Sequence, residues 1–294
     1  MKRAGCLFLT IAPVATLAVY LLGPEPDAGG PDSKPSASQG ADGLARETQE
    51  ELEERIKKMP PGLAAPDKKE LAQQIVASAE NSTLDWKTTY GYIEDIGDGN
   101  GYTAGIVGFC SGTHDMLKLV EQYTEDHPDN GLAKYLPALR AVDGTDSHEG
   151  LDGFPAAWKK EAERPEFREA QDWLRDDDYF DPAVRQGKMD GLNTLGQFVY
   201  YDAMVMHGPG TGPTEFYGIR EEAMQRAKTK AEGGKEEAYL KAFLDVRREV
   251  MQSHDAHRDT SRIDTAQAVF LKAGNLRLDT PLEWRMYGDA YRVK

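Results

Sequence analysis

The spacing of apolar residues predicts that the chain is mainly helical beyond residue 66. Leu71, Ile75 and Ala79 recur at helical spacing, which predicts a first helix over residues 67–81. Similar apolar stripes predict further helices over residues 113–127, 131–142, 166–176, 182–206, 214–230, 235–256 and 262–273. The last twenty residues carry no such stripe, and we expect them to be irregular.

A different pattern occupies residues 86–109. Here Tyr, Ile, Thr and Val are interrupted by Gly97, Gly99, Gly101 and Gly105, which predicts a small antiparallel sheet with tight turns and places Asp98 on one of them. Together with the helices, this sheet predicts an α+β fold that is mainly helical. We expect a lysozyme-like domain of two lobes, with a substrate cleft between them.

The N-terminal region has the features of an export signal. Lys2 and Arg3 precede an apolar run over residues 6–22, so residues 1–23 are interpreted as a signal peptide or an N-terminal anchor. The protein is expected to be secreted, with membrane attachment only if this segment is not cleaved. Residues 24–62 read as a Pro-, Gly- and Ser-rich linker with a short charged helix from Glu47 to Met59, and residues 63–294 as the catalytic domain.

Charge and cysteine content restrict the partners. The 294 residues carry a formal charge of −15, which disfavours nucleic acid and favours a polycation, although an acidic surface also keeps an exported protein soluble. Of the two cysteines, Cys6 lies in the export segment. Cys110 is therefore left without a partner for a disulfide or a cysteine metal site, and is expected to be a small buried hydrophobe.

Two carboxylates are candidates for acid–base chemistry. Glycoside hydrolysis requires an acid that protonates the leaving oxygen and a second carboxylate, held by a different element. Glu80, at the end of the first helix, and Asp98, on a turn of the sheet, fit this requirement. The alternatives are a solvated helix-end Glu and an Asp that only shapes a turn. A calcium loop is disfavoured because Gly97 and Gly99 stand where carboxylate ligands are needed.

A third carboxylate lies in the apolar run over residues 198–206. Asp202 is expected to be buried there, and a buried carboxylate needs a partner. Arg247 and Arg262 are the candidate partners. The result is either a core ion pair unrelated to catalysis or a network that tunes the pKa of Glu80. His207, a lone imidazole at a helix end, is expected to be structural.

Several ordered segments resemble the chitosanases of glycoside hydrolase family 46. They include SAENSTLDW at 78–86, YIEDIGDG at 92–99, GYT at 101–103, GFCSGT at 108–113, AKYLPAL at 133–139, YFDPAV at 179–184, YYD at 200–202, HGPG at 207–210, DTSR at 259–262 and FLKAGNL at 270–276. The resemblance extends from about residue 63 to the end of the chain.

The resemblance implies inverting endo-hydrolysis of the β-1,4 linkages of chitosan. Glu80 matches the general acid, Asp98 the general base, and Thr103 the residue that positions the attacking water. The residues matching the charged network that supports the acid are Asp202, Arg247 and Arg262. The positions matching sugar contacts are Ser82, Tyr92, Asn100, Thr113, Asp115, His257 and Asp289, of which Asp115 offers a carboxylate to glucosamine ammonium groups. Neither a metal nor an organic cofactor is implied, and a monomer is expected.

Two positions depart from the family pattern. Relatives commonly carry Arg where Asn100 stands, and some carry an acidic residue where Arg258 stands, so substrate contacts there are expected to differ. Two alternative functions stay open at this point. One is a lysozyme-like hydrolase of another aminoglycan such as peptidoglycan, and the other is a non-catalytic chitosan-binding surface module.

Overall fold

The computed structural model describes residues 49–253 and 255–294, and residues 59–294 form one compact unit. The helix α1 (Gln49–Lys58) belongs to a separate unit and lies where the short charged helix was predicted. The predicted export segment and residues 24–48 lie outside the described part of the chain. Among the described residues, no helix combines the length and apolar character needed to cross a membrane.

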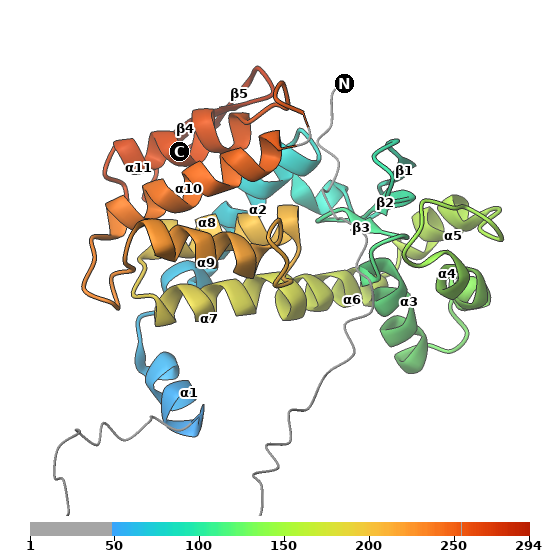
Figure 1. The fold of residues 1–294 in the computed structure, drawn as a ribbon. Coiled ribbons are helices and arrows are strands. Elements are labelled where there is room, and N and C mark those ends of the chain that lie inside the picture. Colours follow the sequence, from blue (N-terminus) through green and yellow to red (C-terminus); the bar gives the residue numbers. More distant parts are fainter. Residues whose placement is uncertain (1–48, 254) are drawn as a thin grey trace, which may run out of the picture. The chain divides into compact units, whose positions relative to one another are not determined.

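The unit 59–294 is mainly helical, which confirms the predicted α+β class (Figure 1). Its α-helices are α2 (Pro66–Glu80), α3 (Asp115–Asp126), α4 (Leu136–Val142), α5 (Phe154–Glu161), α6 (Pro165–Arg175), α7 (Asp181–Met189), α8 (Thr194–His207), α9 (Phe216–Arg226), α10 (Glu236–Gln252) and α11 (Ala268–Lys272). Short 3₁₀ turns are η1 (Gly62–Ala64), η2 (Trp86–Thr88) and η3 (Ala133–Tyr135), and π-helical turns are η4 (Asp176–Phe180) and η5 (Ile263–Gln267).

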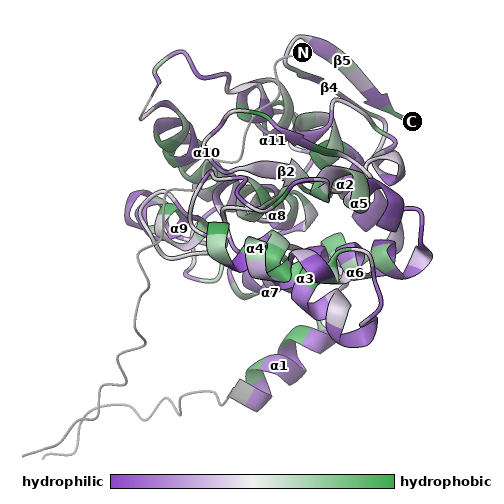
Figure 2. Cartoon of the chain, turned by 90° about the vertical axis from the view of Figure 1, so that its right-hand side faces the viewer, coloured by the Kyte–Doolittle hydropathy of each residue, from purple (hydrophilic) through white to green (hydrophobic). Residues whose placement is uncertain are grey.

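Helix α8 lies at the centre of the core. All of its residues from Leu195 to His207 are buried, and it packs against α2, α7, α9 and α10. Figure 2 shows hydrophobic residues gathered on the inner helices, α8 among them, while hydrophilic residues cover much of the outer surface. Any polar side chain on α8 therefore needs a partner from a neighbouring helix.

The predicted sheet is present. Strands β1 (Ile93–Asp95), β2 (Tyr102–Ala104) and β3 (Phe109–Cys110) pair antiparallel in that order. The β1–β2 connection contains Asp98, as the glycine pattern predicted. A Cβ atom at Gly101, whose φ is +72°, would lie 2.3 Å from the Ser111 hydroxyl, so only glycine allows this close approach.

The described elements of this unit fall into two groups that one long helical run connects (Figure 1). The sheet lies with α3, α4 and α5, while α2 lies with α8 to α11. The run formed by α6, η4 and α7 contacts α3 at one end and α8 at the other. Pro182 sits just after the π-turn η4, where the widened turn accommodates a residue that has no N–H to donate.

Two helix predictions were incomplete. The segment 182–206 is not one helix, because α7 ends at Met189 and Gly191, with φ of +74°, turns the chain before α8 begins. Helix α5, which starts with a Pro at its first turn after Gly153, was not predicted.

The prediction of an irregular C-terminus was wrong. Strands β4 (Leu282–Met286) and β5 (Asp289–Val293) form an antiparallel hairpin. Leu282, Trp284 and Met286 are buried in alternation with exposed residues, which is the period of a half-buried strand. The sequence carried this signal, but an alternation over only five residues is a weaker pattern than the long helical stripes elsewhere in the chain.

Candidate active site

Glu80 occupies the last position of α2, where the core-facing stripe of that helix carries it inward. Its side chain is buried, and its Oε1 atom lies 2.6 Å from Nη1 of Arg262. Burial raises the pKa of Glu80, and the charge of Arg262 opposes this only in part, while Asp202 adds to the increase. The arrangement thus favours a carboxyl group that keeps its proton to higher pH than an exposed Glu.

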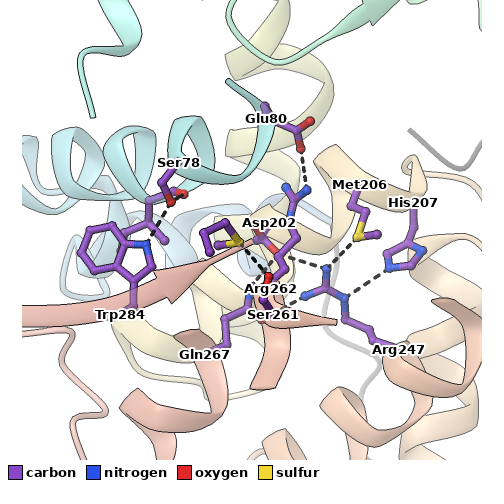
Figure 3. Close-up of polar contacts among 12 residues, drawn as sticks. Ser78, Glu80, Asp202, Met206, His207, Arg247, Ser261, Arg262, Gln267 and Trp284 are labelled. Carbon is purple, nitrogen blue, oxygen red and sulfur yellow. Dashed lines mark hydrogen bonds and ion pairs between the residues drawn. The ribbon is translucent and has the colours of Figure 1, made fainter. Parts of the chain in front are cut away.

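Arg262 is shared between two carboxylates (Figure 3). Its Nε donates to Oδ1 of Asp202 at 2.8 Å, while Oδ2 of Asp202 accepts from Nη2 of Arg247 at 3.0 Å. Although burial works against ionisation, the two arginines hold the pKa of Asp202 below its usual range. The predicted pairing of Asp202 with Arg247 and Arg262 is therefore present in the structure, and it reaches Glu80 through Arg262.

Two further residues, Gln267 and His207, belong to this network, and the role of Gln267 was not predicted from the sequence. It lies on the π-turn η5, donates to Oδ2 of Asp202 at 2.5 Å and accepts from Nη1 of Arg247 at 2.9 Å. A glutamine within the apolar stripe of a helix was the available signal. His207 is buried, and burial together with Arg247 and Arg262 holds its pKa well below its usual range. Its neutral ring accepts from Nε of Arg247 at 3.3 Å.

Asp98 is partly buried in the β1–β2 turn. Its Oδ1 accepts from the backbone N–H of Asn100 at 3.0 Å, while its Oδ2 is buried without a hydrogen-bond partner in the protein. Burial raises the pKa of Asp98, and the hydrogen bonds from Asn100 oppose the shift. One oxygen is thus fixed by the turn and the other is left to accept from a water or a ligand.

Thr103 lies on β2, on the same sheet as the Asp98 turn. It is buried, and its Oγ1 lies 3.4 Å from Sγ of Cys110 on the neighbouring strand. Cys110 is fully buried, as predicted. The hydroxyl of Thr103 is therefore carried by the most regular part of the sheet, where its position is set by the ladder.

Comparison with known proteins adds the family. The model of glycosyl hydrolase family 46 matches residues 74–282, which include Glu80, Asp98 and the whole network around Asp202. The chain belongs to glycosyl hydrolase family 46. It is thus a glycoside hydrolase, as the resemblance predicted, and the expectation of a lysozyme-like fold agrees with its structural neighbours.

Family 46 relatives cover most of the chain. A chitosanase of Streptomyces sp. (strain N174) is 60% identical over 233 residues, which are 79% of this chain and 84% of the relative. The co-crystal structure of chitosanase OU01 with substrate has a TM-score of 0.78 and 54% identity, over 80% of this chain and 100% of that one. A Gynuella sunshinyii family 46 chitosanase in complex with chitotetraose has a TM-score of 0.73 and 32% identity, over 77% and 97%.

Among the predicted sugar contacts, Asp115 is buried and has several hydrogen-bond partners. Its Oδ1 accepts from the hydroxyl of Thr113 at 2.8 Å and from the backbone N–H of Cys110 at 3.0 Å, and its Oδ2 accepts from the Tyr179 hydroxyl at 3.1 Å. Burial raises the pKa of Asp115 to about 6, against these hydrogen bonds. In this family 46 fold Asp115 and Thr113 therefore also fasten the start of α3 to strand β3.

The other predicted sugar contacts are spread over three regions. Ser82 lies two residues after Glu80, with φ of +53°. The Tyr92 hydroxyl donates to Glu94 at 3.2 Å, and Asn100 is buried behind the Asp98 turn. His257 and Asp289 are exposed, after α10 and at the start of β5, respectively. Ser82 thus lies just beyond the end of α2, whereas the others are held by separate elements.

In the part of the chain that the structure describes, no group of three or more His, Cys, Asp and Glu side chains is arranged to hold a metal ion. The polar chemistry of the candidate site is carried by carboxylates, arginines, hydroxyls and amides.

Proposed function

We propose that this chain hydrolyses internal β-1,4 linkages between glucosamine units of chitosan, with inversion at the anomeric carbon. Glu80 is the general acid that protonates the leaving oxygen, and Asp98 is the general base that activates water with the help of Thr103. The observation that carries the proposal is the environment of Glu80, a buried carboxyl at a helix end whose raised pKa suits an acid.

The charged network supports the acid in two ways. Arg262 fixes the orientation of Glu80 through its 2.6 Å contact. Asp202 forms a second ion pair with Arg262 at 2.8 Å and so partly neutralises its charge. Without Asp202, the arginine would favour the ionised form of Glu80 more strongly. Asp202, Arg247 and Arg262 are therefore proposed as supporting residues rather than as groups that touch the substrate.

The environment of Asp98 supports its role as the base. Its Oδ2 atom is buried without a protein partner, which is where a water molecule could be held and deprotonated. Asn100 fixes the other oxygen through its backbone N–H, so replacement of the Arg that relatives commonly carry leaves this contact intact. The inverting stereochemistry is proposed on the family match. Inversion needs space for a water molecule between the two carboxyl groups.

The acidic chain suits a polycationic substrate. Its formal charge is −15, and the named relatives are chitosanases, two of them in structures with substrate or chitotetraose. We assign contacts with the sugar units to Ser82, Tyr92, Asn100, Thr113, Asp115, His257 and Asp289. Free amines of glucosamine would pair with the carboxylates among them, which favours chitosan over N-acetylated glycans.

The assay is the release of reducing ends by residues 59–294 from highly deacetylated chitosan, with chitin and peptidoglycan in parallel. Glu80→Gln removes the acid without changing its size, so turnover on chitosan should fall by a factor of about 10² to 10⁴ while binding is retained. Glu70→Gln, on the same helix but part-exposed, is the matched control and should keep wild-type turnover.

Each outcome has a distinct meaning. Fast release from chitosan alone, lost in Glu80→Gln, supports the enzyme, its substrate and its acid together. Chitosan binding without release by the wild type would favour the binding module, and release from peptidoglycan would favour the other hydrolase. Proton NMR of freshly released ends tests inversion, since an inverting enzyme yields the α anomer first and a retaining enzyme the β anomer.

Export is proposed for residues 1–23, on the charged start and apolar run of this segment. The full chain should appear in the culture medium with an N-terminus created after about residue 20. Recovery of the uncleaved chain in the membrane fraction would instead identify an anchor.

A further inference from the structure

The turn that carries Asp98 begins and ends at one pair of strand residues. Asp95 ends β1, Tyr102 starts β2, and the two face each other in the register of the sheet. Inside the turn, Oδ1 of Asp95 accepts from the backbone N–H of Gly97 at 2.8 Å. Oδ1 of Asp98 accepts from the backbone N–H of Asn100 at 3.0 Å. The placement of Asp98 therefore depends on how firmly the Asp95–Tyr102 pair is held.

His148 lies in the loop between α4 and α5 and contacts both members of this pair. Its ring stacks on the ring of Tyr102, with 4.1 Å between the centroids and 23° between the planes. Its Nε2 atom lies 3.8 Å from Oδ2 of Asp95, beyond hydrogen-bond distance, and has no hydrogen-bond partner among the described residues. The imidazole thus touches β1 and β2 where the turn begins and ends, and it does so mainly with the face of its ring.

The loop that carries His148 is itself fixed against the turn. The backbone N–H of Gly144 donates to the carbonyl of Gly112 at 3.2 Å, and the N–H of Gly112 donates to the carbonyl of Asn100 at 3.0 Å. A Cβ atom at Gly112 would lie 2.1 Å from the carbonyl oxygen of Thr145, so any side chain there would push the loop away. The backbone therefore holds the loop close to the turn, and the ring of His148 is presented from a fixed base.

The exposure of His148 argues for a local role. Its side chain is 33% exposed, so its removal uncovers less apolar surface than the loss of a core aromatic such as Phe154. Its two contacts are both made with the ends of a single turn. We therefore expect the loss of the ring to loosen the Asp98 turn more than it destabilises the domain.

We propose that His148 is a positioning residue for Asp98: its ring, stacked on Tyr102 beside Asp95, keeps the two ends of the turn together and so holds the base in place. The inference rests on the proposed function, in which Asp98 is the base that activates water. His148 itself is not among the residues assigned to catalysis or to sugar contacts.

The first test compares turnover in His148→Ala and His148→Phe. A misplacement of a catalytic group by about 1 Å costs up to about 10²-fold in rate, so kcat on chitosan should fall about tenfold in His148→Ala. KM should stay within a factor of about two, since predicted sugar contacts such as His257 and Asp289 lie on other elements. His148→Phe keeps a flat ring for Tyr102 and should recover at least about half of the wild-type kcat.

The second test follows the turn directly by amide hydrogen exchange. The N–H groups of Gly97 and Asn100 are the donors to Asp95 and Asp98, so NMR of these two amides reports how often the turn opens. Loss of an aromatic pair should speed their exchange by about threefold to tenfold in His148→Ala. His148→Phe should exchange at close to the wild-type rate. This readout needs no turnover and no substrate.

His127→Ala is the matched control. His127 also lies against a tyrosine, with 4.9 Å between its ring and that of Tyr123, but it follows α3 and does not belong to the turn. Its replacement should change neither kcat nor the exchange of the two amides. Wild-type kcat or unchanged exchange in His148→Ala would overturn the proposal, as would a His148→Phe variant as slow as His148→Ala. No release from chitosan by the wild type would reject the proposed function instead, and the exchange rates would still decide whether His148 holds the turn.

Discussion

The network around Asp202 allows one prediction to be worked out in detail. Asp202→Asn keeps the shape of the side chain but removes its charge. Arg247 and Arg262 are 0% and 2% exposed, so neither can turn to water for compensation. Removal of one partner from a buried ion pair costs about 3–5 kcal/mol, and the new amide N–H₂ would also face a donor of Arg247, Arg262 or Gln267. We expect a loss of unfolding free energy in this range.

The matched control is Asp264→Asn. Asp264 lies in the π-turn η5 and pairs with Arg248, but its side chain is 41% exposed, so its loss should cost less than about 1 kcal/mol. Urea denaturation at pH 7 compares the two variants. In a domain of this size, the larger loss corresponds to a fall in thermal midpoint on the order of 10 °C. Equal losses in the two variants would refute the idea that burial sets the strength of the network.

Asp202→Asn should also change how stability and activity depend on pH. The folded pKa of Asp202 is lowered, so its contribution to stability is present above the unfolded value of about 3.9 and is lost as the pH falls through the folded value. The difference in unfolding free energy between the wild type and Asp202→Asn should therefore become smaller at acidic pH. It should also lower the pKa of Glu80, since Asp202 raises it, and shift the alkaline limb of kcat/KM to lower pH. An alkaline limb that stays in place would show that Asp202 does not act on the acid.

Two further predictions concern the sheet lobe. Asp115 has a pKa raised to about 6, so the stabilising effect of its protonated form is present below about pH 4 and lost as the pH rises through 6; Asp115→Asn should abolish this slope, measured by urea denaturation across pH 4–7. Gly101→Ala should destabilise more than Gly144→Ala, because both have positive φ but only the Cβ at Gly101 meets a neighbour, the Ser111 hydroxyl at 2.3 Å. Equal thermal midpoints for the two alanine variants would contradict that reasoning.

Tertiary contacts decided several features that no local pattern contained. The π-turn η5 rotates Gln267 toward Asp202, and a helical stripe assigns no special direction to that residue. The hairpin at the C-terminus bridges α2 and the Arg262 segment, although more than 180 residues separate the two in sequence. Such contacts depend on which surfaces meet after folding, and a local period carries no information about them.

The sequence by itself determined the helical stripes, the glycine-rich turn that holds Asp98 and the need of a buried Asp202 for an arginine partner. Each follows from short-range physics, since side-chain period, positive φ and the cost of burying a charge are readable residue by residue. Only the tertiary structure decided that Arg262 is the link from Asp202 to Glu80, and that Glu80 is buried enough for its pKa to rise. A pKa depends on what surrounds the group in three dimensions, and for Glu80 that environment includes Asp202 on α8 and Arg262 just before the π-turn η5.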